Sequence, residues 1–191
     1  MSLNNIAKKV HYDARQKGFW DNDLSDEHCI VLIVGELMEI IAADRTNKKS
    51  MDDYYNLKME YAKTPYIKLE AYDICIKGSI EEEIADSILR CFDLCGARDW
   101  DIDSYVQNII KFHAPDRVMA LPMSNPNLVE KVYHMTQVIM TGRMEAKDRI
   151  FETLINLWFL SVHYKINIKK HLIWKMRYNK LRPVKNGKTI R

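Results

Sequence analysis

The stretch "GELMEIIAADR", residues 35–45, places two glutamates, Glu36 and Glu39, inside an apolar run. "HCIVLIV", residues 28–34, precedes it, and neither piece shows the alternation that marks a half-buried strand. Ser25 stands before two acidic residues, as at a helix N-cap with an acidic first turn. The sequence therefore predicts one long helix from Ser25 to the end of this stretch, with two carboxylates among core-type neighbours.

The remaining sequence also favours helices. Gly 6 and Pro 5 are low counts for 191 residues, and 47% of the chain is apolar, which suits long helices around a sizeable core. No segment shows a convincing strand pattern, so the predicted fold class is all-α. Further helices are predicted at about residues 4–17, 80–96, 101–114, 128–142, 145–164 and 168–181.

Residues 46–77 are expected to be different. This segment is polar and irregular in pattern, and a connection of this length in a compact domain is often a functional loop or lid. It is rich in tyrosine, with Tyr54, Tyr55, Tyr61, Tyr66 and Tyr72. We therefore expect a long connection that closes over a ligand.

Charge and composition exclude several classes of function. The net charge of +3 is modest, and charges alternate, as in "NLKMEYAK" at residues 56–63, which argues against nucleic acid as a partner. The polar start predicts no signal peptide, and no apolar run approaches the length of a membrane span. The four cysteines form no CxxC pair and are expected to be core thiols of a cytoplasmic protein.

A second acidic pair follows, Glu83 and Asp86 in "EEIAD", in a helix expected to start after Ser79 and to stop at Gly96. Side chains three residues apart share a helix face, so each pair points one way. Four anions that converge in a core need neutralisation, and such hard oxygen ligands suit Mg²⁺ or Mn²⁺. A site of this kind suits a phosphate ligand in turn.

Two other interpretations of the acids stay open at this point. Glutamates on helices usually lie on solvated faces, which fits Glu81 and Glu82 well but fits Glu36 poorly, because apolar residues surround it on the helix. A ferritin-like di-iron site would need ExxH pairs, which the sequence lacks.

The chain also shows an internal repeat of apolar positions. Residues 101–118 align with 167–184, and the helix around "EEIAD" aligns with "DRIFETLINLWFL". We therefore divide the chain into residues 1–118, with the acidic site, and residues 119–191, a degenerate second half with a terminal phosphate-binding helix. The acids do not repeat: Glu36 falls on His134, Glu39 on Gln137, Glu83 on Arg149 and Asp86 on Glu152.

Several segments, taken in order, resemble the MazG-like all-α nucleoside triphosphate pyrophosphohydrolases. They are "AKKVHYDARQKGFWD", "GELMEIIAADR", "EEIAD" and "KMRYNKLRPVKNGK", which together cover nearly half of the chain. The resemblance implies hydrolysis of nucleoside triphosphates, dNTPs or non-standard NTPs, to monophosphate and pyrophosphate. It also implies that Glu36, Glu39, Glu83 and Asp86 bind Mg²⁺, and that a water activated by the metal attacks phosphorus. Either Glu36 or Glu39 would orient or deprotonate that water.

The same resemblance implies that Lys175, Asn179 and Arg182 contact the phosphates, and their spacing places them roughly on one helix face. A solvated basic helix end is the alternative for these residues. Trp20 could stack on the base, with Lys17 near base or phosphate.

The chain departs from the family in two ways. The gap between its acidic motifs is longer than usual, and a degenerate second copy precedes the terminal segment. It is similar in this to dimeric dUTPases, which pair an acidic half with one that has lost its acids, so a tandem arrangement is expected. A homodimer is expected as well. The competing hypothesis is a non-catalytic helical module that binds a nucleotide or protein and uses the acids as a metal staple.

Overall fold

The computed structural model describes residues 2–113 and 127–184 and contains helices but no strands there. This confirms the predicted all-α fold class. The helices are α1 (Leu3–Gln16), α2 (Asp26–Arg45), α3 (Asp52–Tyr61), α4 (Pro65–Cys75), α5 (Ile80–Ala97), α6 (Ile102–His113), α7 (Leu128–Met140), α8 (Ala146–His163) and α9 (Ile168–Leu181). Within those residues, none of the helices is long and apolar enough to cross a membrane.

Serine caps fix the starts of the two helices that carry the acids. The Ser25 side chain accepts a hydrogen bond from the His28 N–H, and Ser79 accepts one from the Glu82 N–H. Each bond satisfies an amide that the first helical turn leaves without an intrahelical partner. Both predicted helix starts are confirmed.

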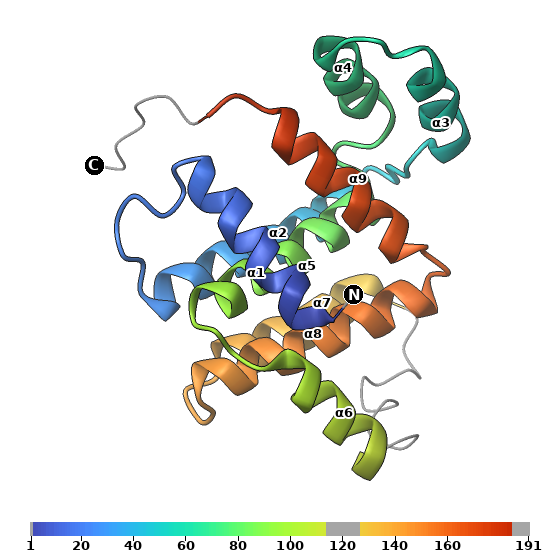
Figure 1. Ribbon diagram of the computed structural model, residues 1–191. Helices are drawn as coiled ribbons and strands as arrows, with labels where there is room; N and C mark the ends of the chain where they lie inside the picture. Colours follow the sequence, from blue (N-terminus) through green and yellow to red (C-terminus); the bar gives the residue numbers. More distant parts are fainter. Residues whose placement is uncertain (1, 114–126, 185–191) are drawn as a thin grey trace.

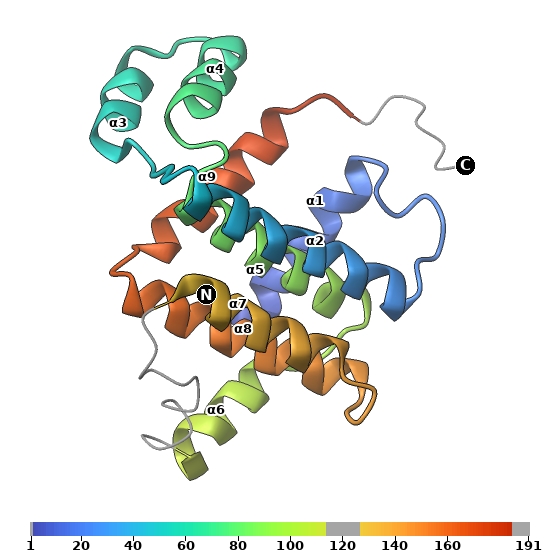
Figure 2. The same ribbon diagram turned by 180° about the vertical axis from the view of Figure 1, so that it is seen from behind.

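Helix α5 is the centre of the fold. It contacts α1, α2, α8 and α9, while α2 also contacts α7, and α7 contacts α8 (Figure 1). Residues from both halves of the chain form one continuous core, with Ile33 and Leu37 of α2 and Ile84 of α5 fully buried in it. Seen from behind, α2 and α7 lie side by side over α5 and α8 (Figure 2). The sharing of one core fixes the position of α2 relative to α5.

Residues 46–77 do not form the predicted irregular connection. They contain α3 and α4, which form a hairpin beside α9 (Figure 1). Thr64 caps α4 and Pro65 occupies its first turn, and both are local helix-start signals. Two tyrosines of this segment belong to a small aromatic core, since Tyr55 and Tyr72 are buried against Trp174 and Tyr178 of α9.

Gly96 does not end α5, as the sequence suggested, since the helix continues to Ala97. A Cβ atom at Gly96 would lie 2.4 Å from the carbonyl oxygen of Ala7. The glycine is therefore needed where α1 crosses α5 at close range, and not for a left-handed helix cap.

The predicted boundary between residues 118 and 119 lies outside the described residues, and the duplication itself stays a prediction. Helices of the two halves are nevertheless in contact with each other. Helix α9 packs on α5, while Tyr105 of α6 packs on Phe151 of α8, with 4.6 Å between ring centroids, and donates a hydrogen bond of 2.7 Å to Glu152.

Candidate functional site

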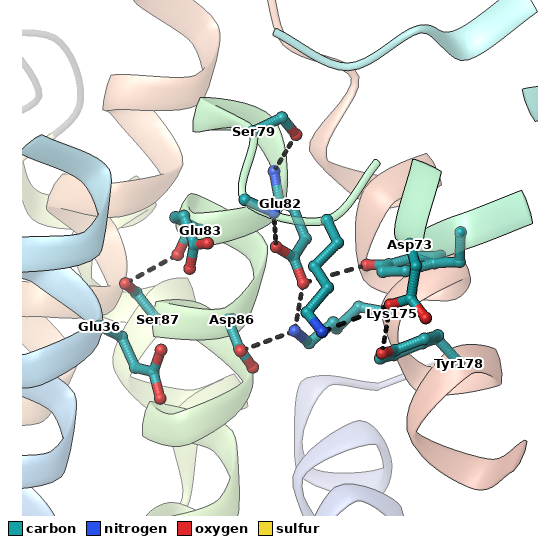
Figure 3. Close-up of polar contacts among 12 residues, drawn as sticks. Glu36, Asp73, Ser79, Glu82, Glu83, Asp86, Ser87, Lys175 and Tyr178 are labelled. Atoms are coloured by element: carbon teal, nitrogen blue, oxygen red, sulfur yellow. Dashed lines mark hydrogen bonds and ion pairs between the residues drawn. The ribbon is translucent and has the colours of Figure 1, made fainter. Parts of the chain in front are cut away.

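Three of the four predicted acids converge between α2 and α5. One carboxylate oxygen each of Glu36, Glu83 and Asp86 lies within 4.8 Å of the others (Figure 3). The three side chains are half-buried. Packing of the apolar faces of α2 and α5 brings Glu36 opposite the other two, which are three residues apart and share a helix face. The folded chain therefore holds three carboxyl groups close together.

Burial and repulsion act on the pKa values of these acids. Burial, followed by the charges of Glu82 and Asp86, raises the pKa of Glu83 to about 8. Burial and the charge of Asp86 also raise the pKa of Glu36, although Arg90 opposes the shift. A bound cation would favour the charged carboxylates and displace the protons.

Two cationic side chains neutralise part of this charge. The Arg90 Nε lies 3.0 Å from Glu36 Oε1, and the Lys175 Nζ lies 2.7 Å from Asp86 Oδ2 and pairs with Glu82 as well. Burial by itself would lower the pKa of Lys175, but the charges of Asp86 and Glu82 raise it above its ordinary value. Both cations therefore stay charged, and the carboxylates outnumber them.

Glu82 contradicts our expectation that it lies on a solvated face. Only 1% of the residue is exposed, and its carboxylate meets Lys175 (Figure 3). Its position four residues before Asp86, on the same helix face, was a signal that sequence reasoning missed. The docking of α9 on α5 buries this face.

Glu39 lies outside this group. It is exposed on α2, and the acidic cluster found in the part of the chain that the structure describes does not include it. The structure therefore brings together Glu36, Glu83 and Asp86, but not all four predicted ligands.

The predicted phosphate-binding residues divide in the same way. Lys175 reaches the cluster. Asn179 is one turn further along α9, and its Oδ1 is buried without a hydrogen-bond partner among the described residues. Arg182 is exposed after the end of α9, with its guanidinium carbon 5.8 Å from the centroid of the Tyr178 ring. Of these three residues, only Lys175 is in direct contact with an acid of the cluster.

The two residues considered for base recognition have partners inside the fold. The Lys17 Nζ donates to the carbonyl oxygens of Lys180, at 3.0 Å, and Arg182, which ties the end of α1 to the end of α9. The Trp20 Nε1 donates to Asp93 at 3.0 Å, and the Trp20 ring meets His11 edge-on at 4.9 Å between centroids. Neither side chain contacts the acidic cluster.

The donor set of the cluster suits a hard divalent cation. Carboxylate oxygens are the ligands that Mg²⁺ prefers, and three of them leave coordination positions for water and phosphate oxygens. The surplus of negative charge has the sign that a divalent cation would neutralise. Comparisons of the chain with family models, curated proteins and solved structures find no match.

Proposed function

We propose that the protein hydrolyses nucleoside triphosphates, dNTPs or non-standard NTPs, to monophosphate and pyrophosphate in a Mg²⁺-dependent reaction. One observation carries the proposal, namely the convergence of Glu36, Glu83 and Asp86 from two helices beside the buried Lys175. The ordered motifs of the sequence, which resemble those of MazG-like enzymes, support the same reaction.

In this reaction, Glu36, Glu83 and Asp86 would hold Mg²⁺, with Mn²⁺ as an alternative, and Glu39 would complete the set only after a change of its side-chain position. The cation, when bound, supplies a Lewis acid for the phosphate oxygens and lowers the pKa of a water. Lys175 would supply a point charge beside the same phosphates, and Arg182 would contact a more distant phosphate oxygen. Glu36 or Glu39 would orient the attacking water and accept its proton.

A second candidate is a non-catalytic module that binds a nucleotide or protein around a structural metal. The ion pairs of Lys175 and Arg90 favour it, because side chains of the chain already neutralise part of the acidic cluster. Turnover distinguishes the two candidates, because only the enzyme releases pyrophosphate.

A pyrophosphate-release assay across the NTPs and dNTPs, with and without Mg²⁺, tests the proposal. Glu36→Gln should abolish release, with circular dichroism as the check on folding, while Glu60→Gln, an exposed acid on α3, should behave like the wild type. Glu39→Gln shows whether the exposed acid takes part. Activity of Glu36→Gln equal to that of the wild type would rule out the ligand assignment.

We further propose that two chains form a homodimer in the cytoplasm. Exposed apolar side chains on the adjacent helices α2 and α7, among them Val31, Leu32, Tyr133 and Met140, support a partner surface. The four buried cysteines are free thiols, which suits a reducing compartment. Sedimentation equilibrium measures the first part, and a single 22.6 kDa species would contradict it.

A further inference from the structure

Glu82 is a buried carboxylate with three partners. It receives a hydrogen bond of 2.7 Å from the Gly78 N–H, another of 3.4 Å from the Tyr72 hydroxyl, and an ion pair from Lys175. A buried carboxylate is costly unless it is paired and hydrogen-bonded in this way. The Glu82 carboxylate is thus a hydrogen-bond acceptor that the fold holds in place next to the Lys175 ammonium.

Lys175 lies between two kinds of carboxylate. Asp86 belongs to the acidic cluster, whereas Glu82 does not (Figure 3). An ammonium group has three N–H donors, and these two carboxylates account for two of them. A third donor suits an oxygen of a phosphate bound at the cluster.

Binding of a cation would change how Lys175 is shared between Asp86 and Glu82. A divalent ion held by Asp86 competes for its oxygens and repels the nearby ammonium group. Glu82 would then be the carboxylate that retains Lys175 next to the cluster. This step rests on the proposed function, since it concerns the site when cation and phosphate are bound.

We propose that Glu82 is a positioning residue, which holds the Lys175 ammonium beside the cation cluster and directs it to the phosphate oxygens of the substrate, and that the α3–α4 hairpin supports it through Tyr72.

The hairpin holds α9 on the side from which Lys175 extends. The Tyr72 ring stacks on Tyr178, one turn after Lys175, with 4.1 Å between centroids and 18° between planes. The Tyr178 hydroxyl donates to Asp73 of the hairpin at 2.7 Å. The hairpin therefore contacts both the acceptor of Lys175 and the helix that carries it, which gives residues 46–77 a role other than that of a lid.

If the Glu82–Lys175 pair served stability alone, its replacement would change the melting temperature but not phosphate binding or turnover in the folded protein. Replacing both members of a buried ion pair by apolar residues is often neutral or stabilising. Glu82→Met combined with Lys175→Met should therefore lower the melting temperature less than Lys175→Met alone, although Asp86 also loses its ammonium partner, yet it should lose phosphate binding and turnover. A folded double variant that retains both phosphate binding and turnover would overturn the proposal.

A double-mutant cycle is the direct test. Glu82→Gln, Lys175→Met and their combination are compared by the Kd for inorganic tripolyphosphate with Mg²⁺, measured by calorimetry, and by pyrophosphate release. We expect Glu82→Gln to raise the Kd and to lower the rate of pyrophosphate release, each by about 10- to 100-fold. The combined variant should lose no more affinity or rate than Lys175→Met alone. Losses that multiply would show that Glu82 does not act through Lys175.

Two controls keep the test specific. Glu81→Gln changes the preceding residue, whose carboxylate accepts from the Ser50 N–H at 2.9 Å, and should leave tripolyphosphate binding unchanged. Should Glu82→Gln fail to fold, Tyr72→Phe takes its place, with an expected loss of about two- to tenfold. Tyr55→Phe, from the same aromatic cluster, should have no effect on binding. Equal binding by Tyr72→Phe and the wild type would then overturn the proposal.

Failure of the proposed function can be told apart from failure of this inference. A wild type that binds tripolyphosphate with Mg²⁺ but cleaves no triphosphate, together with weaker binding by Glu82→Gln, would refute the hydrolase and support the positioning role. A wild type that cleaves triphosphates, with Glu82→Gln equal to it in binding and rate, would refute the positioning role and leave the hydrolase intact.

Discussion

Helices α2 and α5 form one packed pair, and α7 and α8 form another in the same core. The two pairs differ in the charge and the partners of their polar side chains. In the first pair, Glu36, Glu83 and Asp86 crowd together. In the second pair, the Arg149 Nη1 donates to the Ile139 carbonyl at 3.1 Å and Glu152 accepts from Tyr105, while the Arg149 Nε is buried without a hydrogen-bond partner among the described residues.

The predicted alignment makes this comparison position by position, since Arg149 falls on Glu83 and Glu152 on Asp86. At these positions α8 carries a cation and an anion, whereas α5 carries two acids. Burial first, and neighbouring carboxylates second, raise the pKa values of Glu83 and of Glu36 opposite it. Like charges that converge in a folded core oppose stability unless a cation joins them. This contrast is why we propose ligand binding at the first pair and packing at the second.

The largest expected effect comes from neutralising an acid of the first pair, with the aligned acid of the second pair as the control. Asp86→Asn should reduce Mg²⁺-dependent pyrophosphate release on the order of 10²- to 10³-fold, because it removes charge that stabilises the cation at the reacting phosphate. Glu152→Gln, at the aligned position of α8, should leave the rate unchanged. Steady-state kinetics measure both variants, and similar losses in the two would break the distinction between the pairs.

A second prediction concerns the packing of the two pairs. Helix α1 covers α5 at Gly96, whereas Val162, the aligned residue of α8, is 60% exposed. Gly96→Ala should lower the free energy of unfolding by about 1–3 kcal/mol, because its Cβ would overlap the backbone of Ala7. Gly35→Ala is the matched control, since a Cβ there meets nothing within 4 Å.

We expect Gly35→Ala to stabilise the protein by up to about 1 kcal/mol, because an exposed helix interior prefers alanine to glycine. Urea titrations give both values. If Gly96→Ala were as stable as the wild type, the close crossing of α1 over α5 would be wrong.

The sequence was sufficient for the helices whose signals are local. Ser25 and Ser79 mark helix starts through hydrogen bonds to amides three residues later, and such bonds need no partner from elsewhere in the chain. The shared face of Glu83 and Asp86 is local too, because it follows from helical spacing. That is why the all-α class and the shared face of Glu83 and Asp86 could be predicted.

What the sequence did not show depends on how the helices cross. Three residues span about 60° less than a full helical turn, so Glu36 can face α5 while Glu39 faces outward. The burial of Glu82 and the formation of α3 and α4 depend on α9, from the far end of the chain. Gly96 was misinterpreted for the same reason, since its contact is with α1.

The smallest expected effect tests the crowding of the acids directly, in the protein without metal. The pKa of Glu83 is about 8 in the folded chain and 4.5 ordinarily, so between these values the folded state binds a proton that the unfolded state lacks. Stability should therefore fall as the pH rises from about 5 to above 8 in EDTA. We expect a loss of about 1–2 kcal/mol, less than the full shift implies, because the side chain is partly exposed and screened.

Glu83→Gln isolates this contribution from the other titrating groups, among them His171, whose pKa burial lowers. The difference in free energy of unfolding between wild type and variant, from urea titrations at a series of pH values, should change across this window. Saturating Mg²⁺ should remove the decline in the wild type, because the cation replaces the proton. A difference that is independent of pH would mean that Glu83 carries its charge at no cost, and the surplus of negative charge that distinguishes α2 and α5 from α7 and α8 would not exist.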